Sequence, residues 1–154
     1  MQMSELLDAG ALRVIGSATS KKRLFQTIGE MAHSVYDLPA TSVIEALQER
    51  ESLGPTGVGH GVALPHARLD EVGRVLGVFL KLERPLDYGS VDKSPVDLVF
   101  ALFAPRDAGV EHLKALAFVS RTLRNPAVCE KLRANDDPAK FIEILSSDTV
   151  NKAA

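Results

Sequence analysis

The 154-residue sequence contains one cysteine, Cys129, and no tryptophan. A single cysteine forms no intramolecular disulfide, so nothing points to an oxidising compartment. The helical pattern around Cys129 predicts a small buried hydrophobic residue. No apolar run approaches the roughly 20 residues that span a bilayer, and the N-terminus lacks the basic and apolar regions of a signal peptide. We therefore expect a cytoplasmic protein with no membrane partner.

An excess of charge of one sign is also lacking. The 18 Lys and Arg residues nearly balance the 20 Asp and Glu residues, giving a formal net charge of −2. Such a balance provides no field for holding a nucleic-acid backbone, so we expect no nucleic-acid partner. The length and the 45% hydrophobic content suit one domain with a substantial core. We expect a single domain over residues 1–154, with an ordered core from about 12 to 146.

Apolar residues recur at helical spacing in several segments. Ser20 has the character of an N-cap before the first of them, and Pro39 fits the first turn of the second. Gly54 and Pro55 stop that second helix after about Arg50. Asn125-Pro126 and Asp137-Pro138 each combine an N-cap with a proline at the first helical position. The predicted helices are therefore 21–35, 39–50, 110–123, and two short ones that begin at Pro126 and Pro138.

Strand-like patterns occupy four further segments, which are 12–15, 61–64, 74–82 and 96–104. The run 96–104 is so continuously apolar that we expect both of its faces to be covered. Residues 83–95 contain two prolines and a glycine, and we predict a loop there. This order of elements predicts the α/β class, with a mixed β-sheet flanked by helices on both faces.

The stretch 50–68 holds four glycines, two prolines and two of the four histidines. Gly54 and Gly59 have the outer spacing of a P-loop, but His60-Gly61 stands where Lys and Ser or Thr are needed. A dinucleotide fingerprint fails because Val62 occupies the place of its third glycine and the loop leads into a strand. The stretch is therefore not a nucleotide loop.

A metal site formed by His60, His66 and His112 is a further possibility. The sequence has no HExxH motif, no paired cysteines and no carboxylate at ligand spacing within the glycine-rich stretch. We expect no metal and no cofactor.

The remaining chemistry is that of a nucleophilic histidine beside glycines. A neutral imidazole has a free lone pair near physiological pH, and glycines allow backbone amides to approach an anion closely. This combination suits a phosphoryl group carried on His66. We expect His66 at a strand end or in the loop just after it, because Pro65 ends the hydrogen bonding of the strand.

Other residues near this stretch have two interpretations each. His112, in the first turn of its helix, is either a neutral donor to a phosphoryl oxygen or a half-buried helix residue. Its spacing alone slightly favours the half-buried helix residue. Arg50 at a helix C-terminus is more simply a surface residue that interacts with the helix dipole. For His60 we expect an exposed loop position. The acidic side chains of Glu51, Asp70, Glu71 and Glu111 are expected to face solvent, with a patch for a basic partner as the alternative.

The run Arg50-Glu51-x4-Thr56-Gly57-Val58-Gly59-x-Gly61-Val62-Ala63-Leu64-Pro65-His66 resembles a known signature. It is similar to that of the fructose/mannitol-type IIA proteins of the bacterial phosphoenolpyruvate-dependent phosphotransferase system, with the nitrogen-regulatory IIA proteins as the nearest branch. The resemblance continues through residues 95–102 and 111–113, and so covers most of the chain.

This resemblance implies a mixed sheet flanked by helices and a phosphoryl group accepted on Nε2 of His66 from an HPr-type carrier. It implies that Arg50 and His112 support that group, in place of the simpler interpretations above. Thr56, Gly57, Gly59 and Gly61 would form the phosphate-binding loop. No nucleotide or cofactor is required. His60 stands where relatives usually have Asn, and Arg68 replaces a frequent Lys.

Three functional hypotheses remain. The chain is a nitrogen-regulatory phosphohistidine carrier, a sugar-specific IIA component that passes phosphate to a IIB domain, or a binding module that is not phosphorylated. Regulatory protein targets or a IIB domain would be the downstream partners. The sequence contains neither a IIB nor a membrane IIC domain, which favours the regulatory role. The presence of both His66 and His112 argues against the binding module.

Overall fold

The computed structural model describes the backbone of residues 1–153 and the side chains of residues 1–147. Its centre is a mixed sheet in the order β1-β5-β6-β3-β2, with β4 also paired to β6. β5 is antiparallel to β6, whereas β3 and β4 run parallel to β6. The strands are β1 (Leu12–Ile15), β2 (Gly57–Gly59), β3 (Val62–Ala63), β4 (His66–Leu69), β5 (Leu76–Leu86) and β6 (Val96–Pro105).

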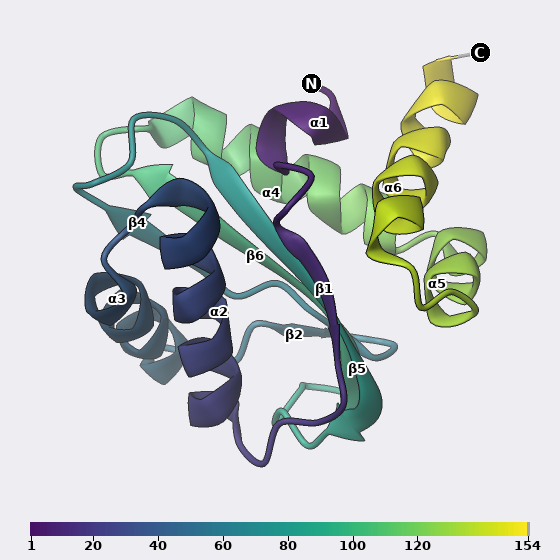
Figure 1. Cartoon of the computed structure of the whole chain (residues 1–154), viewed down its shortest axis with the longest axis horizontal. Helices are drawn as coiled ribbons and strands as arrows, with labels where there is room; N and C mark the ends of the chain where they lie inside the picture. The colour runs from purple at the N-terminus through teal and green to yellow at the C-terminus, as the bar shows by residue number, and fades with distance from the viewer. Residues whose placement is uncertain (154) are drawn as a thin grey trace.

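Helices cover both faces of this sheet, which confirms the predicted fold class (Figure 1). Two helices, α2 and α3, lie together in front of the sheet in this view, and α4 runs behind it. α6 packs against β1, α5 and α1. The helices are α1 (Met3–Leu6), α2 (Lys21–Tyr36), α3 (Ala40–Ser52), α4 (Gly109–Leu123), α5 (Pro126–Arg133) and α6 (Pro138–Ala153).

The core is built around β5 and β6. Every residue from Leu98 to Ala104 is fully buried, as expected for a strand covered on both faces. The Phe79 ring lies edge-on to Phe100 on β6 and to Phe141 on α6, with ring centroids 6.2 and 5.3 Å apart. Burying each such ring contributes roughly 1.5–3 kcal/mol to stability. The buried Cys129 confirms that residue as part of the core.

Three of the predicted helix starts are confirmed by capping bonds. The Ser20 hydroxyl accepts from the amide of Arg23 at 3.1 Å. The Asn125 side chain accepts from the amide of Ala127 at 3.0 Å, and that of Asp137 from Ala139 at 3.0 Å. Each cap satisfies an amide that the first helical turn leaves without an intrahelical partner.

Two predicted boundaries were wrong. The loop predicted from residue 83 begins later, because β5 continues to Leu86 through Pro85. The β5–β6 register shifts between Lys81 and Leu86, so Pro85 lies in a stretch without ladder pairing and its missing N–H costs little. The core also begins before residue 12, since α1 buries Met3 and Leu6.

The segment around Pro65 also differs from the prediction. The strand expected over 61–64 is shorter, since β3 covers only Val62–Ala63, and β4, which was not predicted, follows it along the same edge of β6. Pro65 lacks an N–H, but its carbonyl still accepts from the amide of Leu102 at 3.0 Å, so pairing resumes at once. His66 therefore begins a second strand, whereas the prediction placed it at the end of the first strand or in the loop just after it.

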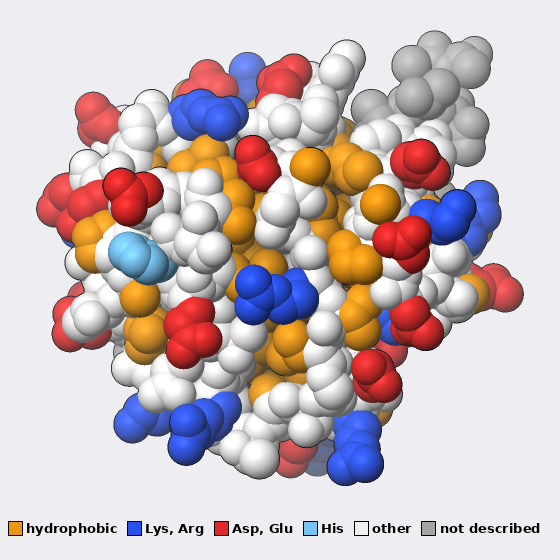
Figure 2. Space-filling model, in the orientation of Figure 1, with side chains coloured by type: hydrophobic (Ala, Val, Ile, Leu, Met, Phe, Trp, Pro, Cys, Tyr) orange, Lys and Arg blue, Asp and Glu red, His pale blue; other side chains and the backbone are white. Residues whose placement is uncertain are grey.

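Acidic and basic side chains are interspersed on the face shown in Figure 2, in keeping with the near-zero net charge. None of the helices in the described part of the chain is long and apolar enough to cross a membrane.

Candidate functional site

The His66 ring is held by a backbone carbonyl. Its Nδ1 lies 2.9 Å from the carbonyl oxygen of Leu64. Because a carbonyl oxygen only accepts hydrogen bonds, Nδ1 carries the hydrogen, and the neutral ring has its lone pair on Nε2. The ring is half-buried, at the start of β4, where His66 pairs with Leu102 of β6. The rigid centre of the sheet thus fixes the backbone of the proposed nucleophile.

His112 lies beside His66, although it comes 46 positions later in the sequence. The two ring centroids are 5.5 Å apart, with the rings tilted by 50°. His112 belongs to the first turn of α4 and is only 5% exposed. Its Nδ1 has no hydrogen-bond partner within the part of the chain that the structure describes.

The environment keeps both imidazoles neutral at pH 7. Burial lowers the pKa of His66, the hydrogen bond to Leu64 opposes that effect, and the charge of Arg50 lowers the pKa further. Burial lowers the pKa of His112 to about 4, and His66 and Arg68 add to the shift. A neutral His66 has a lone pair available to attack phosphorus.

Arg50 reaches the same place from the last turn of α3. Its Nη1 donates to the carbonyl of Gly54 at 3.1 Å, which leaves other guanidinium donors for a ligand. A hollow of about 450 Å³, here called the His112 hollow, is lined by Arg50, His66 and His112. A second of about 360 Å³, the Ser120 hollow, shares Arg50 and His66 with it. The structure therefore brings the three predicted catalytic side chains together.

The predicted phosphate-binding glycines form a hairpin of β2 and β3. His60 and Gly61 make its turn, both in the left-handed region with φ of 56° and 80°. His60 is exposed, as expected, and is one of the few residues other than glycine that adopt a positive φ in the described part of the chain. Neither the His112 hollow nor the Ser120 hollow is lined by Gly57, Gly59 or Gly61.

Packing gives these glycines a second explanation. A Cβ on Gly57 would lie 2.0 Å from the Ser90 hydroxyl oxygen. A Cβ on Gly61 would lie 2.6 Å from Nη2 of Arg133, which donates to the His60 carbonyl. Close approach of Ser90 therefore requires glycine at position 57, and at position 61 the φ of 80° favours glycine, whether or not the loop binds an anion. Phosphoryl binding by the loop amides stays a prediction.

Glu51 is a buried member of the site that the sequence did not reveal. Only 7% of its side chain is exposed, so the expectation that it faces solvent was wrong. Its carboxylate accepts from Nζ of Lys21 at 2.9 Å and from the Thr56 amide at 2.8 Å. The hydroxyls of Thr56 and Tyr88 also donate to it. Thr56 thus uses both of its donors on Glu51 and also lines the Ser120 hollow, so its part in phosphate binding stays a prediction.

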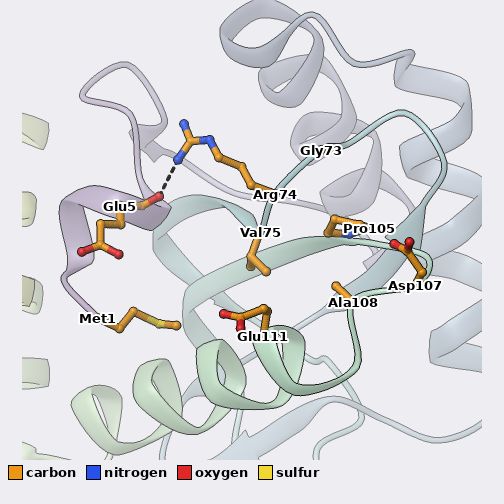
Figure 3. Close-up of a pocket in the computed structure, with 9 residues that line it drawn as sticks. All are labelled: Met1, Glu5, Gly73, Arg74, Val75, Pro105, Asp107, Ala108 and Glu111. Atoms are coloured by element: carbon orange, nitrogen blue, oxygen red, sulfur yellow. Dashed lines mark hydrogen bonds between the residues drawn. The ribbon is translucent and has the colours of Figure 1, made fainter.

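A third hollow, of about 500 Å³, lies elsewhere on the molecule (Figure 3). Its walls come from α1, the segment before β5 and the start of α4, and Arg74 donates to the Glu5 carbonyl there at 2.8 Å. Glu111 lines this hollow and none of the three proposed catalytic side chains does. Within the described residues, no three His, Cys, Asp or Glu side chains are placed to hold a metal ion.

A family model described as "Phosphoenolpyruvate-dependent sugar phosphotransferase system, EIIA 2" matches residues 5–148. The chain belongs to this family.

Relatives of this EIIA 2 chain include regulatory proteins. A nitrogen regulatory protein of Bradyrhizobium diazoefficiens is 40% identical over 146 residues, which cover 95% of each chain. The nitrogen regulatory protein IIA-Ntr of Neisseria meningitidis has a solved structure that covers 93% of this chain and 98% of its own, with a TM-score of 0.87 and 32% identity. Enzyme IIA-mannitol of Escherichia coli, in its complex with phosphorylated enzyme IIB-mannitol, matches 92% of this chain and 99% of its own with a TM-score of 0.78. At 22% identity, this last likeness shows the fold alone.

Proposed function

We propose that this chain is a phosphohistidine carrier that accepts a phosphoryl group on Nε2 of His66 from an HPr-type protein. The observation that carries the proposal is the hydrogen bond from Nδ1 of His66 to the Leu64 carbonyl. That bond leaves the Nε2 lone pair free on a ring whose lowered pKa keeps it neutral. Membership of the EIIA 2 family supports the same role.

The transfer exchanges one P–N bond for another. Nε2 of His66 attacks phosphorus in line, while the P–N bond to the donor histidine breaks and its electron pair returns to the donor nitrogen. No nucleotide takes part, because the donor phosphohistidine already stores the required free energy. The chain's contribution is positioning and stabilisation of charge on the transferring group.

Arg50 and His112 have the chemistry to stabilise that charge. Both line the His112 hollow with His66. A guanidinium offers several N–H donors in a planar fork that suits phosphoryl oxygens. His112, neutral at pH 7 because of its low pKa, keeps one N–H to donate and places no net charge beside its neighbour.

A regulatory role is the more specific part of the proposal. The relative that is 40% identical and the solved structure with a TM-score of 0.87 are both named nitrogen regulatory proteins. We therefore assign this chain to nitrogen regulation, with regulatory proteins as the downstream partners. Transfer onward to a IIB domain is the alternative, and a labelled IIB domain in the experiment below would identify it.

The experiment supplies phosphoenolpyruvate labelled with ³²P, enzyme I and an HPr-type carrier. We expect an acid-labile, alkali-stable label on the wild-type chain and on His33→Ala, because His33 is an exposed histidine on α2. His66→Ala should take no label. An unlabelled wild-type chain beside a fully labelled carrier would rule out the proposed function.

A further inference from the structure

The buried carboxylate of Glu51 joins three segments that are distant in the sequence. Lys21 reaches it from the start of α2, Thr56 from the start of the glycine hairpin, and Tyr88 from the connection between β5 and β6. Nζ of Lys21 also lies 4.2 Å from the centroid of the Tyr88 ring. A carboxylate that is only 7% exposed and accepts from all of these groups is strongly held in one orientation.

A continuous series of hydrogen bonds leads from Glu51 to the His66 ring. The carboxylate accepts from the Thr56 amide at 2.8 Å. The Thr56 carbonyl accepts from the Leu64 amide at 2.9 Å. The Leu64 carbonyl then accepts from Nδ1 of His66 at 2.9 Å. Thr56 and Leu64 thus connect the Glu51 carboxylate to the His66 imidazole.

The same carboxylate also acts on the other side of the site. Glu51 follows Arg50 in the last turn of α3, so fixing Glu51 fixes the helix end from which the Arg50 guanidinium extends. Arg50 in turn donates to the Gly54 carbonyl, between Glu51 and Thr56. The positions of the His66 ring and of the Arg50 guanidinium therefore both depend on the Glu51 carboxylate.

We propose that Glu51 is a positioning residue for phosphoryl transfer, which sets the tautomer and orientation of the His66 ring through Thr56 and Leu64. The expected effect on the rate of transfer rests on the proposed function. The expected effect on the tautomer and orientation of the His66 ring does not, because it requires no donor protein. Glu51 does not touch the reacting atoms, and neither the His112 hollow nor the Ser120 hollow is lined by it.

The test is Glu51→Gln, with Glu45→Gln as the matched control. Glu45 is an exposed residue of the same helix that lines neither hollow. Gln keeps the size of the side chain but has a single acceptor oxygen and no charge. We expect nitrogen NMR of the His66 ring to show mainly the Nδ1–H tautomer in the wild type and in Glu45→Gln, and a clear gain of the Nε2–H tautomer in Glu51→Gln.

Two further readouts separate positioning from a general loss of stability. Removing the negative charge of Glu51 should lower the pKa of His66 further, whereas the pKa of His112, which responds to His66 and Arg68, should change less. The maximal rate of transfer should fall roughly ten- to a hundredfold. The donor concentration that gives the half-maximal rate should change little. Restoring the charge on a shorter side chain, in Glu51→Asp, should recover part of the Nδ1–H tautomer.

An unchanged His66 tautomer in Glu51→Gln would overturn the inference, and so would transfer at the wild-type rate. Should Glu51→Gln fail to fold, Glu51→Asp decides alone, with a shifted tautomer supporting the inference and an unshifted one overturning it. If the wild-type chain accepts no phosphoryl group, the proposed function fails. The NMR comparison then still judges the role of Glu51, because it needs no donor.

Discussion

At the scale of single residues, the site depends on one backbone hydrogen bond. The Leu64 carbonyl decides which nitrogen of His66 is free, and the choice of residue at position 64 does not determine it. A sequence pattern cannot show this, because every residue has a carbonyl. What the sequence did show is that His66 follows a proline and a series of glycines, a setting in which a histidine nucleophile is chemically reasonable.

The low pKa of His112 predicts a pH dependence of stability. Its pKa is about 4 in the folded chain, whereas an unfolded histidine titrates near 6.5. Between these values the unfolded state binds more protons, so the free energy of unfolding falls as the pH drops from 6.5 towards 4. Protonation of His112 lowers the free energy of unfolding by at most about 3 kcal/mol.

Urea unfolding at pH 7, 5 and 4 measures this effect, with His112→Asn for comparison. Asn has no proton to gain in this range, so the variant should lose less stability on acidification than the wild type. Parallel loss in the two proteins would contradict the assigned pKa. The comparison cancels the contribution of the carboxylates, which titrate in both proteins.

At the scale of elements, the glycine hairpin is the segment whose interpretation changed most. Its glycines suggested an anion-binding loop, which stays a prediction, and the structure adds close neighbours that also restrict these positions. Gly57 lies against Ser90, and Gly61 against the ion pair of Arg133 and Asp97. The hairpin is thus fixed by contacts with the β5–β6 connection and with α5.

Gly57→Ala should destabilise the fold by about 1–3 kcal/mol, because the added methyl group would overlap Ser90. Gly73→Ala is the control, since a Cβ there meets nothing within 4 Å. That variant should be as stable as the wild type or slightly more stable. Thermal unfolding of the three proteins measures the difference, and equal midpoints would show that Ser90 moves aside without cost.

The sequence predicts an element well when the residues that determine it are close together in the chain. The caps at Ser20, Asn125 and Asp137 and the apolar run of β6 are local features, and these predictions were confirmed. The pairing on the two sides of Pro65 was misjudged, because it depends on the Pro65 carbonyl accepting from β6. The Glu51 cluster could not be found, because Lys21 and Tyr88 are 30 and 37 residues away from it in the sequence. Only the family resemblance brought Arg50 and His112 to His66 in advance.

At the scale of the whole molecule, the site lies where two helices meet an edge of the sheet. Among the described strands, β4 pairs only with β6, and α3 packs against β4. The first turn of α4 brings His112 to the same strand end. The sheet fixes His66, while the helices supply Arg50 and His112, so the parts of the site are rigid elements with little loop between them.

Three exposed apolar side chains lie beside the site. Leu53, Val58 and Leu113 are 81%, 52% and 64% exposed, and each lines one of the two hollows beside His66. If the proposed function holds, we expect these side chains to contact the phosphoryl donor, because an exposed apolar group beside a reactive centre suits a transient protein partner.

Leu113→Asp should therefore raise the donor concentration for half-maximal transfer about tenfold or more, while the maximal rate changes little. Val91→Asp is the control, since Val91 is 82% exposed and lines neither hollow. Steady-state transfer assays over a range of carrier concentrations separate the two parameters. A fall in maximal rate alone would place Leu113 in the chemical step and not in docking.

The most direct test of the account is the position of the phosphorus atom on the His66 ring. The chain is labelled with ¹⁵N and phosphorylated by phosphoenolpyruvate, enzyme I and an HPr-type carrier, and phosphorus–nitrogen couplings are measured by NMR. Because Nδ1 is held by the Leu64 carbonyl, the account predicts coupling to Nε2 of His66. Coupling to Nδ1 of His66, or to a nitrogen of another histidine, would contradict it.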